Sequence, residues 1–374
     1  MHQHVVRGRT SLCHLQLTAL MARLNMQRPL LVCGKRMQQF FAERVGLALP
    51  CFSGYHPNPD LSDCAAGAVM YCAMGCDGLI SLGGGSAMDT AKGVKAMLVC
   101  ADEDAVKRSD LPAQCVLPHI AIPGTAGTGA EATPIAVVYV NNEKLSLDHP
   151  ALLPEGVLLD GSLLDTLPDY HKKACAMDAL AQGIESYWAV KATAESRVHA
   201  ARAIRGVVCN MTAYLTGDPA AQDAMLEAAY ESGCAIRISR TTAAHAMSYQ
   251  LTKRLGYAHG HACMLTLPHL WAQLRESGEG AVLKELAQLL GLPAGADGSA
   301  LLLGLLAALD MDAKALPEDA VLDALAASVN AQRLGNHPQP LTTAQLRDTY
   351  VRALTPMERD TREAALSLWR QYGG

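Results

Sequence analysis

The segment MDALAQGIESYW, residues 177–188, places three polar side chains in an otherwise apolar helical pattern. Asp178 and Gln182 are four residues apart and Glu185 follows three residues later, so on a helix all three share one face. Buried carboxylate and amide groups need polar partners or a bound ion. We therefore expect this segment to start a buried helix and to contribute to a functional site.

Histidines gather in a second segment, where four of the chain's thirteen occur. They are His245, His259, His261 and His269. Neutral imidazole is a common metal donor, and a carboxylate often completes such a site. His245 and His259 are fourteen residues apart, which on one continuous helix would separate them by roughly 21 Å. Gly256 and Gly260 offer a break that would bring them together, although the spacing alone also fits ordinary surface or capping histidines.

Two glycine-rich turns are candidates for binding an anion. LISLGGGSAMDTAK, residues 79–92, runs from an apolar strand pattern through three glycines into a helical pattern, and PGTAGTGAE, residues 123–131, follows another strand pattern. Successive glycines let backbone N–H groups approach a phosphate at a helix N-terminus. Tight structural turns use the same residues, but two such loops at one edge of a parallel sheet indicate a nucleotide site.

The order of the apolar runs predicts two domains. Short runs bounded by Gly and Pro alternate with helical segments through residue 160, which indicates a mostly parallel sheet; they are residues 29–34, 78–85, 119–125 and 156–160. Later segments have helical periodicity; they include residues 172–190, 194–215 and 219–239, with a core helix in 296–309 and a loop at 292–300. We expect an α/β domain over 1–161 and an all-α domain over 162–374.

Composition and charge argue against several classes of function. The 374 residues carry a formal charge of -5, so no polycationic surface for nucleic acid is expected. The twelve cysteines form no CxxC pair and are expected to be buried free thiols. The N-terminal segment lacks the apolar core of a signal peptide, and no run is long enough to span a membrane. We expect a soluble protein of the cytoplasm.

Several motifs in order resemble one enzyme family. GGGSxxDxxK, TAGTGxE, a DALxxxIExY helix and two His fourteen apart, the second in an HG pair, resemble the iron-dependent (group III) alcohol dehydrogenases. HPNP at 56–59, LLPEGVLLD at 152–160 and NHP at 336–338 extend the resemblance over nearly the whole chain. It implies a Rossmann-like dinucleotide-binding domain, a helical domain of the dehydroquinate synthase-like architecture, a divalent metal and a homodimer or larger homo-oligomer.

The resemblance places the metal ligands at Asp178, Gln182, His245 and His259. Gln182 departs from the family, which usually has His there. Asp and Gln at this spacing still share a helix face, but an amide oxygen is a weaker donor than imidazole, which leaves the metal open between Fe(II) and Zn(II). For proton relay, Tyr249 stands where the family often has a further His, and His261 is a second candidate; a structural role is open for each.

The resemblance also assigns contacts to a nicotinamide dinucleotide. These are Asn58, Gly84, Gly85, Ser86, Asp89, Thr125, Thr128 and Lys144. NAD-selecting members have an Asp after the first strand, where this chain has Gly34, followed by Lys35 and Arg36. Loss of an anion and gain of two cations suits a 2′-phosphate, so we predict NADPH rather than NADH as the preferred cofactor.

Within this family the chain looks closest to phosphonoacetaldehyde reductases, which implies a small aldehyde as substrate. Cationic and hydroxyl side chains near the histidines could bind a phosphonate, or could be solvated helix faces. They are Arg237, Arg240, Thr241, Thr242 and Lys253. Three alternatives stay open: a generic short-chain primary alcohol dehydrogenase, a dehydroquinate synthase-type cyclase, and a degenerate non-catalytic cofactor-binding homologue.

Overall fold

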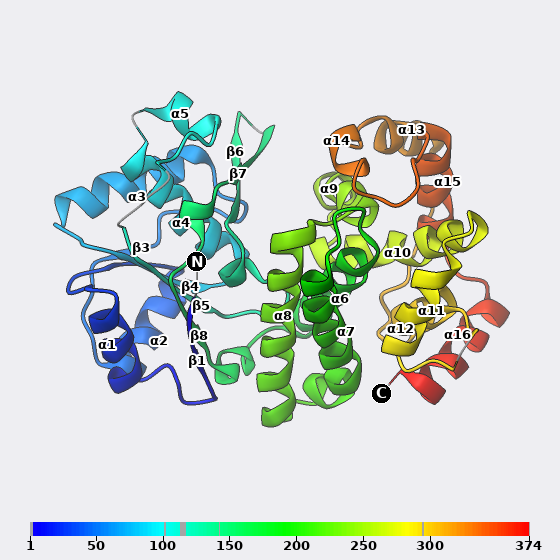
Figure 1. Cartoon of the computed structure of the whole chain (residues 1–374), viewed down its shortest axis with the longest axis horizontal. Helices are drawn as coiled ribbons and strands as arrows, with labels where there is room; N and C mark the ends of the chain where they lie inside the picture. The colour runs from blue at the N-terminus through cyan, green and yellow to red at the C-terminus, as the bar shows by residue number, and fades with distance from the viewer. Residues whose placement is uncertain (1–2, 101, 113–116, 142, 294, 374) are drawn as a thin grey trace. The chain divides into compact units, whose positions relative to one another are not determined.

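The computed structural model describes residues 3–100, 102–112, 117–141, 143–293 and 295–373 (Figure 1). The chain divides into two compact units, Met1–Thr166 and Leu167–Gly374. Each unit is described by itself. Among the described residues, every helix is too short or too polar to cross a lipid bilayer.

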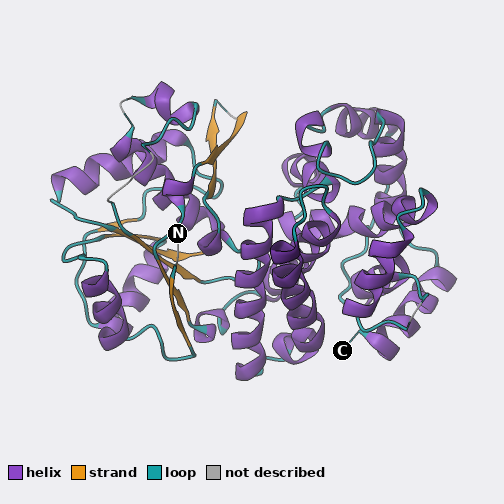
Figure 2. Ribbon diagram, viewed as in Figure 1, coloured by secondary structure: helices purple, strands orange, loops and turns teal. Residues whose placement is uncertain are grey.

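The first unit contains a parallel sheet of six strands (Figure 2). In spatial order they are β1 (His4–Arg7), β8 (Gly156–Leu159), β5 (His119–Pro123), β4 (Leu79–Gly83), β2 (Leu30–Cys33) and β3 (Cys51–Phe52). The four predicted apolar runs form β2, β4, β5 and β8, which confirms the α/β class. The strand before Gly34 is the second of the chain and not the first, because β1 precedes it.

Helices cover both faces of this sheet. Leu31 and Ile80 pack in one apolar cluster with α1 (His14–Arg23) and α2 (Lys35–Val45). Leu30 and Leu79, one residue earlier on the same strands, pack in another with α3 (Leu61–Ala73) and α4 (Gly85–Val99). Strands buried on both faces need apolar side chains in both directions, which explains why these runs are continuous and not alternating.

The remaining elements of this unit lie outside the four predicted runs. They are α5 (Glu103–Lys107) and an antiparallel pair, β6 (Ile135–Val140) with β7 (Glu143–Asp148). β1 and β3 also escape detection by pattern, since β1 is only partly buried and β3 has two residues.

The described residues of the second unit form helices joined by loops, and no strand is found among them, as predicted. Its helices are α6 (Asp169–Trp188), α7 (Ala194–Leu215), α8 (Pro219–Ser239), α9 (Ala243–Leu255), α10 (His259–Glu276), α11 (Gly280–Leu289), α12 (Gly298–Ala308), α13 (Asp319–Ala327), α14 (Ala331–Leu334), α15 (Thr343–Leu354) and α16 (Arg359–Tyr372). Residues 177–188 form the end of α6 and not its start, because a more polar first part, DYHKKACA, precedes them. The predicted loop at 292–300 ends earlier, since α12 begins at Gly298.

The cysteines differ in part from the expectation of buried thiols. All that the structure describes are free, and Cys33, Cys64, Cys234 and Cys263 are buried, but Cys72 and Cys209 are exposed. Cys115 lies outside the described residues.

Candidate metal centre

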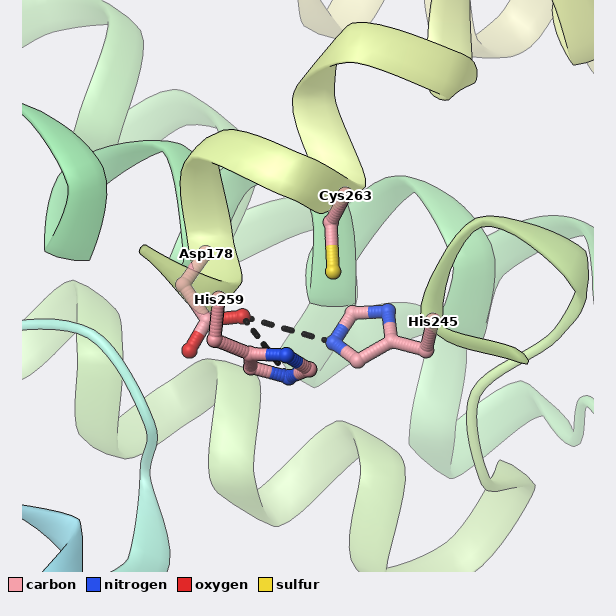
Figure 3. A group of neighbouring side chains, drawn as sticks. All are labelled: Asp178, His245, His259 and Cys263. Atoms are coloured by element: carbon pink, nitrogen blue, oxygen red, sulfur yellow. Dashed lines mark ion pairs between the residues drawn. The ribbon is translucent and has the colours of Figure 1, made fainter. Parts of the chain in front are cut away.

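Three helices of the second unit bring four possible ligands together (Figure 3). Asp178 comes from α6, His245 from α9, and His259 and Cys263 from α10. Each offers one ligand atom, and these atoms all lie within 4.8 Å of one another. The structure thus brings together Asp178, His245 and His259, which sequence resemblance selected, and adds Cys263.

The two glycines near His259 have different roles. Helix α9 ends at Leu255, and Gly256 caps it in the left-handed conformation, with φ of 76°, so the chain turns before α10 begins at His259. As a result the His245 and His259 ring centroids lie 5.3 Å apart. Gly260 does not form the break that we expected of it, because it lies within the first turn of α10.

Gly260 instead allows α10 to lie directly against α6. A Cβ atom on Gly260 would be 2.1 Å from the Ala174 carbonyl oxygen and 2.5 Å from Asp178 Cβ. No side chain fits in that space, so only glycine permits this backbone approach. The contact places His259, the first residue of α10, close to Asp178 on α6.

Hydrogen bonds fix which nitrogen each histidine turns toward the group. His245 Nδ1 bonds the Glu185 carboxylate and therefore carries the proton. Ser248 Oγ donates to the His245 carbonyl oxygen at 2.8 Å, so it accepts from His259 Nδ1 at 3.1 Å. Both rings are thereby held with Nε2 directed toward Asp178, where a neutral imidazole could bind a cation.

The arrangement leaves buried acceptors facing one another. Asp178 Oδ1 lies 3.4 Å from His245 Nε2 and 4.0 Å from His259 Nε2. The side chains of Asp178 and His245 are only 4% and 5% exposed, and within the described part of the chain neither Asp178 Oδ1 nor His245 Nε2 has a hydrogen-bond partner. Buried acceptors are almost always satisfied, and a divalent cation would satisfy these together. The residues therefore fit a metal.

Glu185 supports this group from the same face of α6. Its Oε1 accepts from the Thr242 hydroxyl at 2.6 Å, the Thr242 N–H at 3.2 Å and the Ala244 N–H at 2.8 Å, while Oε2 bonds His245. Burial opposes ionisation, but the neighbouring His245 and these hydrogen bonds hold the pKa of Glu185 below its ordinary value. An ionised carboxylate behind a histidine fixes its orientation and raises its basicity as a ligand.

Gln182 is the second ligand on α6 that the resemblance implies. Its Oε1 accepts a hydrogen bond from Ser232 Oγ at 2.8 Å, and its side chain also bonds Asp178. The same hydroxyl also donates to the Ala229 carbonyl oxygen at 2.7 Å. The Gln182 amide thus lies between Asp178 and α8.

The two relay candidates have unequal surroundings. The Tyr249 ring stacks on His259, with centroids 5.8 Å apart and planes 10° apart, and its phenol oxygen accepts a hydrogen bond from Arg333. His261 is buried, with Nδ1 3.1 Å from the Tyr170 hydroxyl and Nε2 2.6 Å from the Met311 carbonyl oxygen. Tyr249 thus lies beside the metal group, by which we mean Asp178, His245, His259 and Cys263. Both ring nitrogens of His261 are engaged in hydrogen bonds elsewhere.

Sequence reasoning missed Cys263 and Arg333. Cys263 had a signal, because it follows His259 by four residues, as Gln182 follows Asp178. Arg333 had none, since α14 meets Tyr249 only through the fold.

In the first unit, the predicted cofactor residues follow neighbouring parallel strands. Gly34 follows β2, Gly84 follows β4 and Thr125 lies just after β5, so these turns lie at one edge of the sheet. The Gly124 N–H donates to the Gly83 carbonyl oxygen at 2.8 Å, and Gly83 has φ of 144°, which only glycine adopts readily. This edge is where open α/β sheets bind nucleotides.

Several other predicted cofactor residues lie next to one another in this unit. The Asn58 N–H donates to Ser86 Oγ at 3.3 Å, and a Cβ on Gly85 would be 3.3 Å from Thr128 Cγ2. Burial raises the pKa of Asp89 to about 6, a shift that the charges of Lys92 and Lys144 limit. Lys35 and Arg36 are exposed in the first turn of α2, directly after Gly34.

Comparison with known families identifies the chain. Residues 3–161 match the family model "Iron-containing alcohol dehydrogenase", and residues 173–354 match the C-terminal model of the Fe-containing alcohol dehydrogenases. The chain belongs to the iron-containing alcohol dehydrogenase family. Both units are covered, and the candidate ligands lie within the second match.

Proteins of similar sequence are named for several different substrates. A phosphonoacetaldehyde reductase of Streptomyces viridochromogenes is 37% identical over 228 residues, which is 58% of this chain and 58% of that protein. A lactaldehyde reductase of Escherichia coli is 28% identical over 74% of this chain and 75% of its own length. The aligned region thus spans less than two thirds of the Streptomyces protein.

Solved structures confirm the fold. A sulfoacetaldehyde reductase from Bifidobacterium kashiwanohense in complex with NAD+ has a TM-score of 0.86 at 24% identity, covering 94% of this chain and 98% of that one. An iron-containing alcohol dehydrogenase from Thermotoga maritima has a TM-score of 0.80 at 25% identity, covering 95% and 98%.

Replacement of Gly260 by alanine tests the contact between α10 and α6. The added Cβ must push the helices apart, so we expect the free energy of unfolding to fall by about 1–3 kcal/mol. We also expect less bound metal per chain, because His259 moves away from Asp178. Urea unfolding and elemental analysis measure the two effects. Gly280→Ala is the control, since a Cβ there meets nothing within 4 Å; equal behaviour of the two variants would contradict this account.

Proposed function

We propose that this chain is a metal-dependent, NAD(P)H-linked alcohol dehydrogenase that reduces a small aldehyde. The observation that carries the proposal is the pair of buried acceptors, Asp178 Oδ1 and His245 Nε2, 3.4 Å apart, with His259 Nε2 beside them. Membership of the iron-containing family supports it. These two atoms lack a hydrogen-bond partner among the described residues, which is a costly arrangement for buried groups and weighs against a degenerate homologue.

Asp178, His245 and His259 would hold a divalent metal, which when bound supplies Lewis acidity toward a carbonyl oxygen. The residues around it prepare the site. Glu185 and Ser248 keep both imidazoles with Nε2 turned inward, and Gln182 orients Asp178. The glycine-rich edge of the first unit would hold the dinucleotide whose nicotinamide exchanges hydride with the substrate.

Tyr249 is the better of the two proton-relay candidates. Its phenol oxygen accepts from Arg333, and its ring lies against His259, beside the candidate ligands. A phenol in this position can deliver a proton to a product alkoxide. His261 has no such access, because Tyr170 and Met311 engage both ring nitrogens.

We further propose that the aldehyde carries an anionic group, with phosphonoacetaldehyde, giving 2-hydroxyethylphosphonate, as the first candidate. Two relatives are named for acetaldehydes with a phosphonate or a sulfonate. Arg333 supports this choice, since its guanidinium lies 5.0 Å from the Tyr249 ring centroid, next to the metal group. A guanidinium binds such anions through two parallel hydrogen bonds. Thr242, a sequence candidate for this role, is already bonded to Glu185.

Metal removal tests the central proposal. Dialysis against a chelator should abolish NADPH-dependent aldehyde reduction, and added Zn(II) or Fe(II) should restore it. Asp178→Asn should lower metal affinity by more than about a hundredfold, since it replaces a charged ligand in a buried site. Glu276→Gln, an exposed carboxylate on α10, is the matched control. Full activity in metal-free wild-type protein would disprove metal dependence.

The cofactor preference depends on the first turn of α2. We expect a higher kcat/KM with NADPH than with NADH, because Lys35 and Arg36 lie at a helix N-terminus that suits a 2′-phosphate. Arg36→Ala should lower kcat/KM for NADPH about tenfold and leave NADH unchanged. Gln38→Ala, exposed on the same helix, should change neither. A strong wild-type preference for NADH would reject the assignment.

The substrate class can be read from paired kinetics. Phosphonoacetaldehyde should exceed butanal in kcat/KM by at least about tenfold, the equivalent of one charge-assisted hydrogen bond. Arg333→Ala should remove that advantage with little effect on butanal, and Arg333→Lys should restore only part of it. Equal losses for both aldehydes would assign Arg333 a structural role, and a wild-type advantage below tenfold would favour a generic short-chain alcohol dehydrogenase.

A further inference from the structure

Cys263 lies in the metal group, but the proposed function assigns it no role. It follows His259 by four residues on α10, so the two side chains share one helix face. Its side chain is fully buried, and its sulfur belongs to the set of ligand atoms within 4.8 Å of one another. In Figure 3 the sulfur points from α10 toward the space between Asp178 and His245.

Independent evidence for a ligand in this space comes from the other side chains. Asp178 Oδ1 and His245 Nε2 are buried acceptors that lack a hydrogen-bond partner among the described residues. A thiol has one weakly donated proton, so it cannot satisfy both of them. A cation bound by the oxygen, the nitrogen and the sulfur would satisfy all of them at once.

Gln182 and Cys263 are the two candidates for a fourth ligand. The Gln182 amide contacts Ser232 on α8, and a neutral amide is a weaker donor than the thiolate that Cys263 can offer. We propose that Cys263 is the fourth metal ligand, and that the resulting donor set of one carboxylate, two imidazoles and one thiolate makes this a zinc site. The inference rests on the proposed function only in placing a divalent metal at Asp178, His245 and His259.

The chemistry of the donors sets the choice of metal. On binding, the Cys263 S–H bond breaks, its proton leaves to solvent, and the sulfur keeps the electron pair that forms the metal–sulfur bond. Thiolate is a soft ligand and therefore favours Zn(II), a borderline-soft ion, over Fe(II). Nitrogen and oxygen ligands also bind Zn(II) more tightly than Fe(II). The iron of the family name is thus not the expected metal of this chain.

X-ray absorption of the wild-type protein loaded with Zn(II) tests the ligand directly. We expect one sulfur scatterer at about 2.3 Å and nitrogen or oxygen scatterers at about 2.0–2.2 Å. A spectrum that fits nitrogen and oxygen alone would overturn the proposal. This measurement needs no variant, so it decides the question even where a substitution at Cys263 prevents folding.

Cobalt spectroscopy of variants gives a second readout. Wild-type protein loaded with Co(II) should show a near-ultraviolet thiolate-to-metal charge-transfer band, which Cys263→Ser should lose. Cys234→Ser, a buried cysteine on α8, and Gln182→Ala should both keep it. In Cys263→Ser the affinity for Zn(II) should fall at least about tenfold, and the affinity for Fe(II) should fall by a smaller factor. Persistence of the band in Cys263→Ser would contradict the assignment.

The two proposals can fail separately. Metal-dependent aldehyde reduction without a sulfur ligand would leave the proposed function intact and reject Cys263 as a ligand. A sulfur ligand in a protein that reduces no aldehyde would support the zinc site and reject the function. Failure of the wild-type protein to bind Zn(II) or Co(II) in equilibrium dialysis would reject both.

Discussion

The close approach of α10 to α6 at Gly260 is the constraint on which the metal group depends. The contact leaves no room for a Cβ, and it fixes the distance between the backbone that carries Asp178 and the backbone that carries His259. His245 then reaches the group because the left-handed Gly256 reverses the chain between α9 and α10. Two glycines with different physical roles thus bring together side chains that the sequence separates.

The polar face of α6 is a supporting structure for that group. Asp178 faces the histidines, Gln182 connects Asp178 to Ser232 on α8, and Glu185 receives His245 and the first turn of α9. Each of these buried groups would be destabilising alone, because burial of an unpaired polar group costs several kcal/mol in desolvation. Together they satisfy one another, except at the inward-facing atoms. The unsatisfied atoms therefore mark the place for an ion.

Much of this fold could be predicted from the sequence, for identifiable reasons. The four central strands and helices α7 and α8 have strong apolar patterns bounded by glycine or proline, and the structure confirms them. The short edge strand β3, with two residues, has too little pattern to detect. The convergence of Asp178, His245 and His259 followed from resemblance and from a glycine break.

The details of the site depended on contacts distant in sequence. Gln182 contacts Ser232, which comes from another helix, so local spacing could not reveal this contact. The role of Gly260 required the position of Ala174. Cys263 was visible as a position four residues after His259, but a cysteine in an apolar helix usually packs as a small hydrophobic residue. What distinguishes Cys263 is its neighbours Asp178 Oδ1 and His245 Nε2, buried atoms without a hydrogen-bond partner in the described part of the chain.

The candidate ligands differ in their access to solvent, which would give metal exchange a direction. The His259 side chain is 37% exposed, whereas those of His245 and Asp178 are 5% and 4% exposed. A chelator could therefore reach an ion in this group from the side of His259, whose ring contacts Ser248 and Tyr249. Loss of such an ion would then depend on the motion of one partly exposed ring.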